Sequence, residues 1–175
     1  SSGFDVIIGA IEAVNLPSEE YDLITAWMVL EHLHKPKLAL KKLHAAAKPG
    51  AVLAISIPNC ARSFWSFQSD WFPLHVPNHL YHFNEETASK LLHSAGWRVY
   101  RCMHQRVAID WALSALLRAQ SRGYARPVAK KLIKILSGRM GLVFNITFFP
   151  IALVLATFRR GTRMTLWASR AEEAE

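Results

Sequence analysis

The stretch "YDLITAWMVLEHLHKP", residues 21–36, decides the fold. Its first seven residues form a β-rich apolar run, which predicts a buried strand. The strand opens onto a bulky aromatic, a thioether, a carboxylate and an imidazole: Trp27, Met28, Glu31 and His32. Ligands of open α/β sheets bind beyond the carboxyl ends of the strands. The stretch therefore predicts the mouth of a binding cleft at the edge of such a sheet.

Further strands and helices surround this stretch. Strands are predicted for four apolar or alternating runs: "FDVIIG" (4–9), "AVLAISIP" (51–58), "WRVYRC" (97–102) and "TRMTLWAS" (162–169). One helix is predicted from Pro36 to the "KPG" turn at 48–50, because proline suits a first helical turn. A second helix follows the N-cap Asn84 and ends at Gly96. Two or three more helical stretches are expected within residues 107–158.

Alternating strands and helices predict an α/β fold. We expect a partial Rossmann-like, doubly wound and mostly parallel sheet, with a helical insert before the last strand. The core is expected to cover residues 1–106 and the basic, apolar insert residues 107–160. The last strand and an acidic tail are expected at residues 161–175.

Composition and cysteine usage limit the possible classes of protein. The 175 residues suffice for one domain with a sizeable core. Cys60 and Cys102 lack metal or redox spacing and fit a reducing compartment. We therefore expect a cytoplasmic protein.

Charge is distributed unevenly along the chain. Residues 1–110 contain ten basic and ten acidic side chains, whereas residues 111–171 contain eleven basic ones and no acid. The apolar run at 140–158 is long enough to span a bilayer, but Asn145, Thr147 and Pro150 and the strand that follows favour a helical cap. Such a cap is packed on the protein or dips into an anionic membrane surface, at the inner membrane face. Nucleic acid is the less favoured partner, because aromatics are not interleaved with the basic residues.

Three histidines lie in the sequence "HVPNHLYHF", at positions 75, 79 and 82. A histidine can remove a proton from a reacting group near neutral pH, so His79 and then His82 are the candidate catalytic groups. The alternative is that they bond a backbone carbonyl or cap the following helix. Metal binding by the three histidines, or by Glu31 with His32, is not expected.

An ordered set of motifs resembles a known family. "YDLITAWMVLEHLHKPKLALKKLHAAAKPGAVLAISIPN" is similar to class I S-adenosylmethionine-dependent methyltransferases in its "EHL" step, its "KPG" turn and its "PN" strand exit. "WFPLHVPNHLYHFNEETASKLLHSAGW" resembles the ubiquinone-type and sugar-cluster methyltransferases. The resemblance covers about residues 1–110 and 160–170.

The resemblance implies a set of residues that contact S-adenosylmethionine. Gly9, Ala10 and Ile11 would lie by the adenine, although the family often has an acid at the position of Ala10. Further along the chain, the methionine part of the cofactor would be lined by Ala26, Trp27 and Met28, with His32 in the same cleft.

The family's glycine-rich turn and ribose-binding acid have no counterpart in these residues. The family's strand order is 3-2-1-4-5-7-6, and this sequence begins at the third strand. We therefore expect the C-terminal part of a longer protein, with weak cofactor binding by this part alone.

The resemblance implies methyl transfer, here expected at a hydroxyl of a hydrophobic or lipid-linked small molecule. A methyltransferase of nucleic acid is a less favoured possibility. The alternative from another class is a non-catalytic module derived from the same fold, which binds a membrane or a partner protein.

Overall fold

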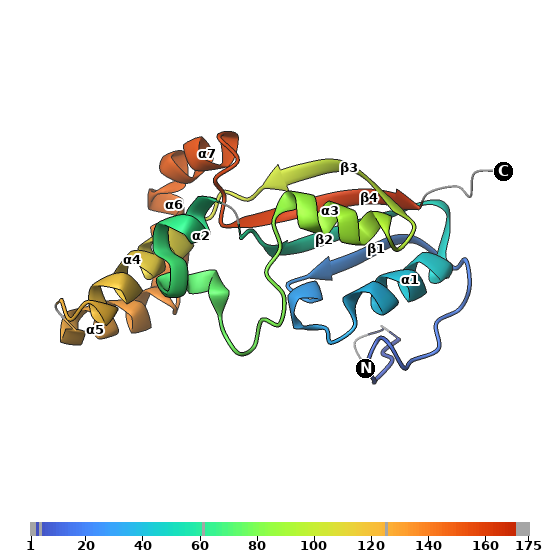
Figure 1. Ribbon diagram of the computed structural model, residues 1–175, viewed down its shortest axis with the longest axis horizontal. Helices are drawn as coiled ribbons and strands as arrows, with labels where there is room; N and C mark the ends of the chain where they lie inside the picture. The colour runs from blue at the N-terminus through green and yellow to red at the C-terminus, as the bar shows by residue number, and fades with distance from the viewer. Residues whose placement is uncertain (1–2, 4, 61, 125, 171–175) are drawn as a thin grey trace.

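The computed structural model describes residue 3 and residues 5–60, 62–124 and 126–170 (Figure 1). Four strands form one sheet in the order β1-β2-β4-β3: β1 (Tyr21–Trp27), β2 (Ala47–Pro58), β3 (Trp97–His104) and β4 (Arg163–Arg170). β1 and β2 are parallel, whereas β4 runs antiparallel to both of its neighbours. The sheet is therefore mixed, with three strands in one direction and β4 in the other.

This topology confirms the predicted α/β, Rossmann-like fold. The observed order is that expected for the fourth, fifth, seventh and sixth strands of the family. β2 was expected to start at residue 51, but it begins at Ala47, where the chain already pairs with Tyr21 of β1. The helix ends at Ala46, just before the "KPG" sequence, as predicted. Residues 48–51 belong to β2 but form an irregularity, at which the pairing with β1 shifts and Gly50 has a φ of 75°.

The strand predicted at residues 4–9 is absent from the described part of this segment. Phe4 lies outside the described residues, and residues 5–9 form no strand. Val6 is 75% exposed and Ile8 is 93% exposed. A strand needs neighbours to satisfy its backbone groups, and the described chain supplies none for this segment. The outer edge of β1 likewise has no partner strand among the described residues.

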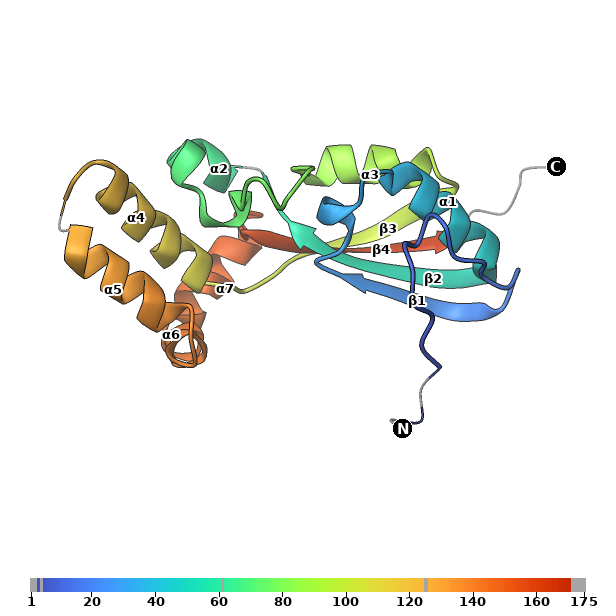
Figure 2. The ribbon, with the colours of Figure 1, turned by 90° about the horizontal axis from the view of Figure 1, so that it is seen from below.

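Two helices cover one face of the sheet (Figure 2). These are α1 (Pro36–Ala46) and α3 (Glu85–His93), and both were predicted. The core between them and the sheet is aliphatic and fully buried: Leu40, Leu53, Ile55, Ile57, Leu92, Met164 and Leu166. Trp97 closes this layer and donates a hydrogen bond from Nε1 to the carbonyl oxygen of Leu40 at 3.0 Å.

The N-terminus of α3 follows the predicted capping chemistry. The Asn84 side chain accepts a hydrogen bond from the backbone N–H of Thr87 at 2.8 Å. The Thr87 hydroxyl oxygen accepts one from the N–H of Asn84 at 3.0 Å, which completes a capping box. The capping box defines the start of α3, directly after the loop at residues 75–83, which we call the histidine loop.

The helical insert lies at one end of the sheet (Figure 1). It contains α4 (Ile109–Ser121), α5 (Arg126–Leu136), α6 (Met140–Thr147) and α7 (Phe149–Thr157). Between β2 and α3, the chain forms α2 (Arg62–Phe67) and two short 3-10 helices, η2 (Gln68–Asp70) and η3 (Phe72–Leu74). Asn145 of α6 accepts hydrogen bonds at Oδ1 from the N–H groups of Ala108 and Ile109, both at 3.0 Å. This side chain caps α4 from another helix, so it is a structural polar group within the apolar run.

A buried ion pair joins the insert to the last strand. Asp110 is fully buried and accepts hydrogen bonds from Arg163 at 2.8 and 2.9 Å. The hydroxyl of Thr162 donates a third bond to the same carboxylate at 2.8 Å. The start of α4 is therefore tied to the start of β4.

Within the described residues, no single helix is long and apolar enough to cross a membrane. α6 and α7 reach the required length and composition only as a pair, and their axes are bent by 64° at the break between them.

Candidate functional site

The carboxyl end of β1 makes a sharp turn. Met28 has a positive φ of 53°, an unusual conformation for a residue with a side chain, and its N–H donates to the carbonyl oxygen of Ser56 at 2.8 Å. The Trp27 side chain is 53% exposed. The chain then forms the 3-10 helix η1 (Leu30–His32), which contains Glu31. The residues of this stretch therefore differ in environment, since Trp27 is exposed and Glu31 is buried.

A cavity of about 200 Å³, which we call the β1-end cavity, lies between β1, α1 and residue 11. Ile11 and Ala26 both line it, so the fold brings these two predicted cofactor residues together. The other lining residues are aliphatic except Thr25: Ile24, Val29, Leu30, Leu33, Ala39, Leu40, Leu43 and Ile55. Gly9 and Ala10 are exposed and are not among the residues that line this cavity.

A turn holds Ile11 against α1. The N–H groups of Ala13 and Val14 donate to the carbonyl oxygen of Ala10 at 2.8 and 3.0 Å. The Lys42 ammonium donates to the carbonyl oxygen of Val14 at 2.8 Å. The segment therefore keeps a defined position although its preceding residues form no strand.

The histidine loop packs on η1. The N–H groups of Leu80 and Tyr81 donate to the carbonyl oxygen of Glu31 at 2.8 and 3.3 Å. The ring of His32 donates from Nδ1 to the carbonyl oxygen of Asn78 at 2.9 Å. Two segments more than forty residues apart are joined in this way.

His79 lies at the centre of four histidine rings. Its ring meets those of His32 and His75 edge-on, with centroids 4.7 and 5.0 Å apart, and the centroid of His82 is 6.5 Å away. His79 donates from Nδ1 to the carbonyl oxygen of Pro73 at 2.9 Å, and His82 from Nε2 to that of Leu74 at 2.9 Å. The structural alternative, bonds to backbone carbonyls, therefore holds for both. Each ring keeps its second nitrogen for another partner.

Glu31 lies beside His32 and His79, and we call the four histidines and Glu31 the histidine cluster. The protonation behaviour of its buried members follows from burial. Glu31 is 0% exposed, and neither of its carboxylate oxygens has a hydrogen-bond partner within the described residues. Burial raises the pKa of the Glu31 carboxyl, against smaller opposing effects from its own backbone N–H, His32 and Arg163. Burial also lowers the pKa of His79, which is 8% exposed. The cluster thus combines a neutral imidazole with an unsatisfied buried carboxyl group.

Two polar residues beside the site were not identified as functional candidates from the sequence. Asn59, which follows β2, is 1% exposed and donates from its side-chain nitrogen to the carbonyl oxygen of Gly161 at 2.8 Å. Gln105 donates to the hydroxyls of Ser56 and Thr165 at 2.6 and 2.9 Å. Their positions after strands β2 and β3, together with the "PN" strand exit for Asn59, are the sequence signals that could have selected them.

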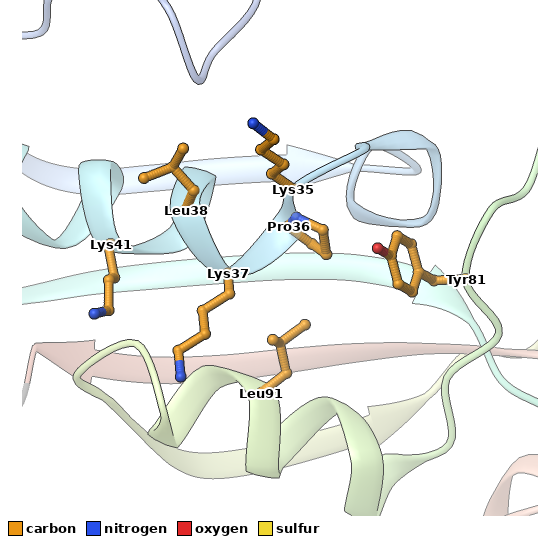
Figure 3. Close-up of a pocket in the computed structure, with 7 residues that line it drawn as sticks. All are labelled: Lys35, Pro36, Lys37, Leu38, Lys41, Tyr81 and Leu91. Carbon is orange, nitrogen blue, oxygen red and sulfur yellow. The ribbon is translucent and has the colours of Figure 1, made fainter.

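A groove of about 520 Å³ lies between α1 and α3 and begins beside the histidine loop. Figure 3 shows Leu91 of α3 pointing towards α1 and the Tyr81 hydroxyl lying near Pro36. The remaining lining residues are Leu38 and three lysines: Lys35, Lys37 and Lys41. The groove therefore has an apolar lining with a basic rim.

Comparison with family models matches residues 4–101, more than half of the chain, to a family described as a methyltransferase domain. The chain belongs to this methyltransferase family. No sequence among the curated proteins matches it. The subgroup near the ubiquinone-type and sugar-cluster enzymes stays a sequence-based prediction.

Solved methyltransferases share the fold. A SAM-dependent methyltransferase from Thermotoga maritima aligns with a TM-score of 0.59 at 15% identity, over 96% of this chain and 65% of that one. One from Mesorhizobium loti gives 0.52 at 14% identity, over 93% and 68%. The 1,6-didemethyltoxoflavin N1-methyltransferase of Burkholderia thailandensis, which holds S-adenosylhomocysteine, gives 0.50 at 12%, over 95% and 50%. The chain thus spans less than two thirds of the Thermotoga and Burkholderia proteins.

S-adenosylmethionine is the cofactor that this family and fold imply. The β1-end cavity suits the flat apolar faces of an adenine ring, because its lining is almost wholly aliphatic. None of its lining residues is acidic, so it offers no carboxylate to a ribose. The residues present therefore fit one part of the cofactor. Ile11 and Ala26 are the residues that would contact it in this cavity.

Proposed function

We propose that the full-length protein transfers a methyl group from S-adenosylmethionine to a hydroxyl of a hydrophobic or lipid-linked small molecule. One observation carries this proposal. The β1-end cavity and the histidine cluster meet at η1, where Leu30 lines the cavity and Glu31 and His32 belong to the cluster. A methyl donor and an acceptor would then meet at the carboxyl end of the sheet.

The cofactor supplies an electrophilic methyl group, and the protein has to align the acceptor with it. The lone pair on the second nitrogen of His79 accepts a hydrogen bond from the acceptor hydroxyl and orients its oxygen. The bond from His79 to Pro73 fixes the ring for this task. His82 is the second candidate for contact with the acceptor, whereas Trp27 and Met28 border the cofactor side.

The groove between α1 and α3 supports the choice of acceptor. It adjoins the histidine loop at Tyr81, and its lining combines apolar side chains with three lysines. An acceptor with an apolar tail and a phosphate or carboxylate group matches this chemistry.

The insert supports docking on an anionic membrane surface. Large apolar side chains on α6 and α7 are more than half exposed: Leu142, Val143, Ile146, Ile151 and Val154. A packed cap would bury them, so the described chain leaves this surface uncovered. Exposed lysines lie on the neighbouring α5, and a helix with apolar and basic faces binds anionic lipid. We accordingly place the protein in the cytoplasm, peripherally at the inner membrane face.

The same surface favours a second candidate function. A non-catalytic module derived from the fold would use this surface to bind a membrane or a protein and would transfer no methyl group. Methyl-transfer assays of the full-length protein with apolar hydroxylated acceptors distinguish the two functions. Transfer to nucleic acid is not favoured by any contact in the described residues.

His79→Ala in the full-length protein is expected to lower turnover by about 100-fold, the smaller end of the range for a group that acts on a reacting proton. The affinity for S-adenosylmethionine should change little, because the β1-end cavity does not include His79. Steady-state kinetics with calorimetric cofactor titration measure both quantities. A fall in cofactor affinity alone would show that His79 does not act on the acceptor.

The 175-residue chain by itself is expected to show no measurable heat of S-adenosylmethionine binding. Its described residues form a cavity for one part of the cofactor and offer no acid to the ribose in that cavity. Calorimetry on the folded chain tests this expectation. Micromolar binding would contradict our account of how the cofactor is held.

A further inference from the structure

We propose that Glu31, His32 and His79 form a binding site for a divalent transition-metal ion such as Zn²⁺. Binding of the ion follows from the geometry alone, and its use in methyl transfer rests on the proposed function. The sequence argued against a metal because no cysteine and few carboxylates lie near the three histidines, and because the prolines of this loop break the regular helix that usually presents metal ligands. The fold brings Glu31 and His32 together with one of the three loop histidines, His79.

The three side chains already lie at a spacing suited to an ion. One ligand atom from each lies within 4.8 Å of the other two. Side-chain rotations can close this spacing around an ion bonded at about 2.1 Å. Two imidazoles and one carboxylate form a donor set used by zinc and non-haem iron proteins, and they leave coordination positions open.

The buried carboxylate is the strongest indication of a missing partner. Glu31 is completely buried, yet neither oxygen of its side chain has a hydrogen-bond partner in the part of the chain described. A buried carboxyl group without a partner is unfavourable as the neutral acid and far more so as the ionised carboxylate. A divalent cation would supply the partner, and the exposed side chain of His32 gives the ion a path from solvent.

Backbone carbonyls orient both imidazoles. His32 donates to the carbonyl oxygen of Asn78 and His79 to that of Pro73, each from Nδ1 at 2.9 Å. A carbonyl can only accept, so Nδ1 carries a proton, and in the neutral ring Nε2 then holds the lone pair that a metal needs. Metal-bound histidines commonly make this second bond, which fixes the ring before the ion arrives.

A second cluster provides an internal comparison. Glu85, Cys102 and His104 also lie within 4.8 Å of one another. Glu85, however, is paired with Arg159, and burial raises the pKa of the Cys102 thiol to about 12. A metal requires a deprotonated thiol and a free carboxylate. The second cluster is therefore not expected to bind the ion.

An ion at the first cluster would change how the acceptor is held. The acceptor hydroxyl would bind at an open coordination position and release its proton to solvent more readily, because a cation lowers the pKa of a bound oxygen. His79 would then act on the acceptor through the ion in place of a direct hydrogen bond.

The test is a calorimetric titration of zinc chloride into the tag-free, full-length protein after dialysis against a chelator. We expect one bound ion per chain in the wild type. Glu31→Gln removes the negative charge with little change of shape and should weaken zinc binding at least 10-fold, as should His79→Gln. Cys102→Ser is the control from the second cluster and should bind as the wild type does. Circular dichroism verifies that each variant is folded.

Two results would overturn the site. One is the absence of zinc binding by the wild type, and the other is equal binding by the wild type and folded Glu31→Gln. A methyl-transfer assay of metal-free and zinc-loaded protein separates the two proposals. Transfer that is unaffected by removal of bound zinc leaves methyl transfer intact and overturns only the role of the ion. A protein that binds zinc but transfers no methyl group overturns the proposed function and leaves the site.

Discussion

Asp110→Asn is expected to lower the free energy of unfolding by about 3 kcal/mol, the lower end of the range for breaking a buried ion pair. The wild-type carboxylate is fully buried and receives two hydrogen bonds from Arg163 and one from Thr162. The amide keeps the shape but loses the charge, and its nitrogen faces donors. Arg163 is 31% exposed, so water compensates part of the loss.

Chemical denaturation of wild type and variant, followed by tryptophan fluorescence, gives the difference. Glu86→Gln is the matched control, because it removes an ion pair with Lys90 at which both side chains are more than 70% exposed. The denaturation midpoint of this control should equal that of the wild type, because exposed ion pairs contribute little to the free energy of unfolding. Equal midpoints for Asp110→Asn and the wild type would show that the insert is not held to β4 by this pair.

Replacing Lys130, Lys131 and Lys134 by glutamate is expected to weaken binding to anionic vesicles by more than 100-fold. Each basic residue near an anionic surface contributes about 1 kcal/mol, so the loss of three contributes about 3 kcal/mol. The three new negative charges add repulsion. Wild-type binding should fall as salt rises, because exposed charges are screened over about 10 Å at 0.1 M.

Vesicle co-sedimentation of the full-length protein at two salt concentrations measures this effect. The control replaces Lys90, Arg98 and Arg101 by glutamate, which makes the same change of charge outside the insert. It should retain most of the binding. Equal binding to neutral and anionic vesicles would contradict the electrostatic part of the proposal. No binding to either would overturn the proposal that the insert docks on a membrane.

The elements predicted correctly are those specified by local signals. The N-cap residue Asn84 predicts the start of α3, and Pro36 predicts the first turn of α1. The continuous apolar run of β2 predicts a strand buried on both faces, as observed from Leu53 onward. These signals lie within a few residues of the structure that they specify.

The failures concern interactions between distant residues. The β-rich run at residues 5–9 cannot form a strand without neighbours, however favourable its composition. The composition of 140–158 predicts helices, but not that their apolar side chains face outward. Four helices form in the described part of the insert instead of two or three, and the run itself is divided by a bend of 64°.

In the candidate site, too, local signals placed some residues correctly, whereas contacts between distant residues were missed. Sequence position placed Ala26 and His32 at a strand end, but the sequence assigned Ile11 and Ala26 to different parts of the cofactor and did not predict that they line one cavity. The contact of Glu31 and His32 with His79 could not be predicted, because it depends on how the loop before α3 folds back onto η1. Whether His79 and His82 are catalytic stays a prediction.

The most direct test of the central claim is calorimetric titration of S-adenosylhomocysteine into the full-length protein and its Ala26→Phe variant. A phenyl ring at position 26 would occupy the β1-end cavity. Leu38→Phe on α1 is the control outside that cavity. We predict one-site binding by the wild type and Leu38→Phe, and its loss in folded Ala26→Phe. No binding by the full-length wild type, or equal binding by Ala26→Phe, would contradict a cofactor site at the carboxyl end of β1.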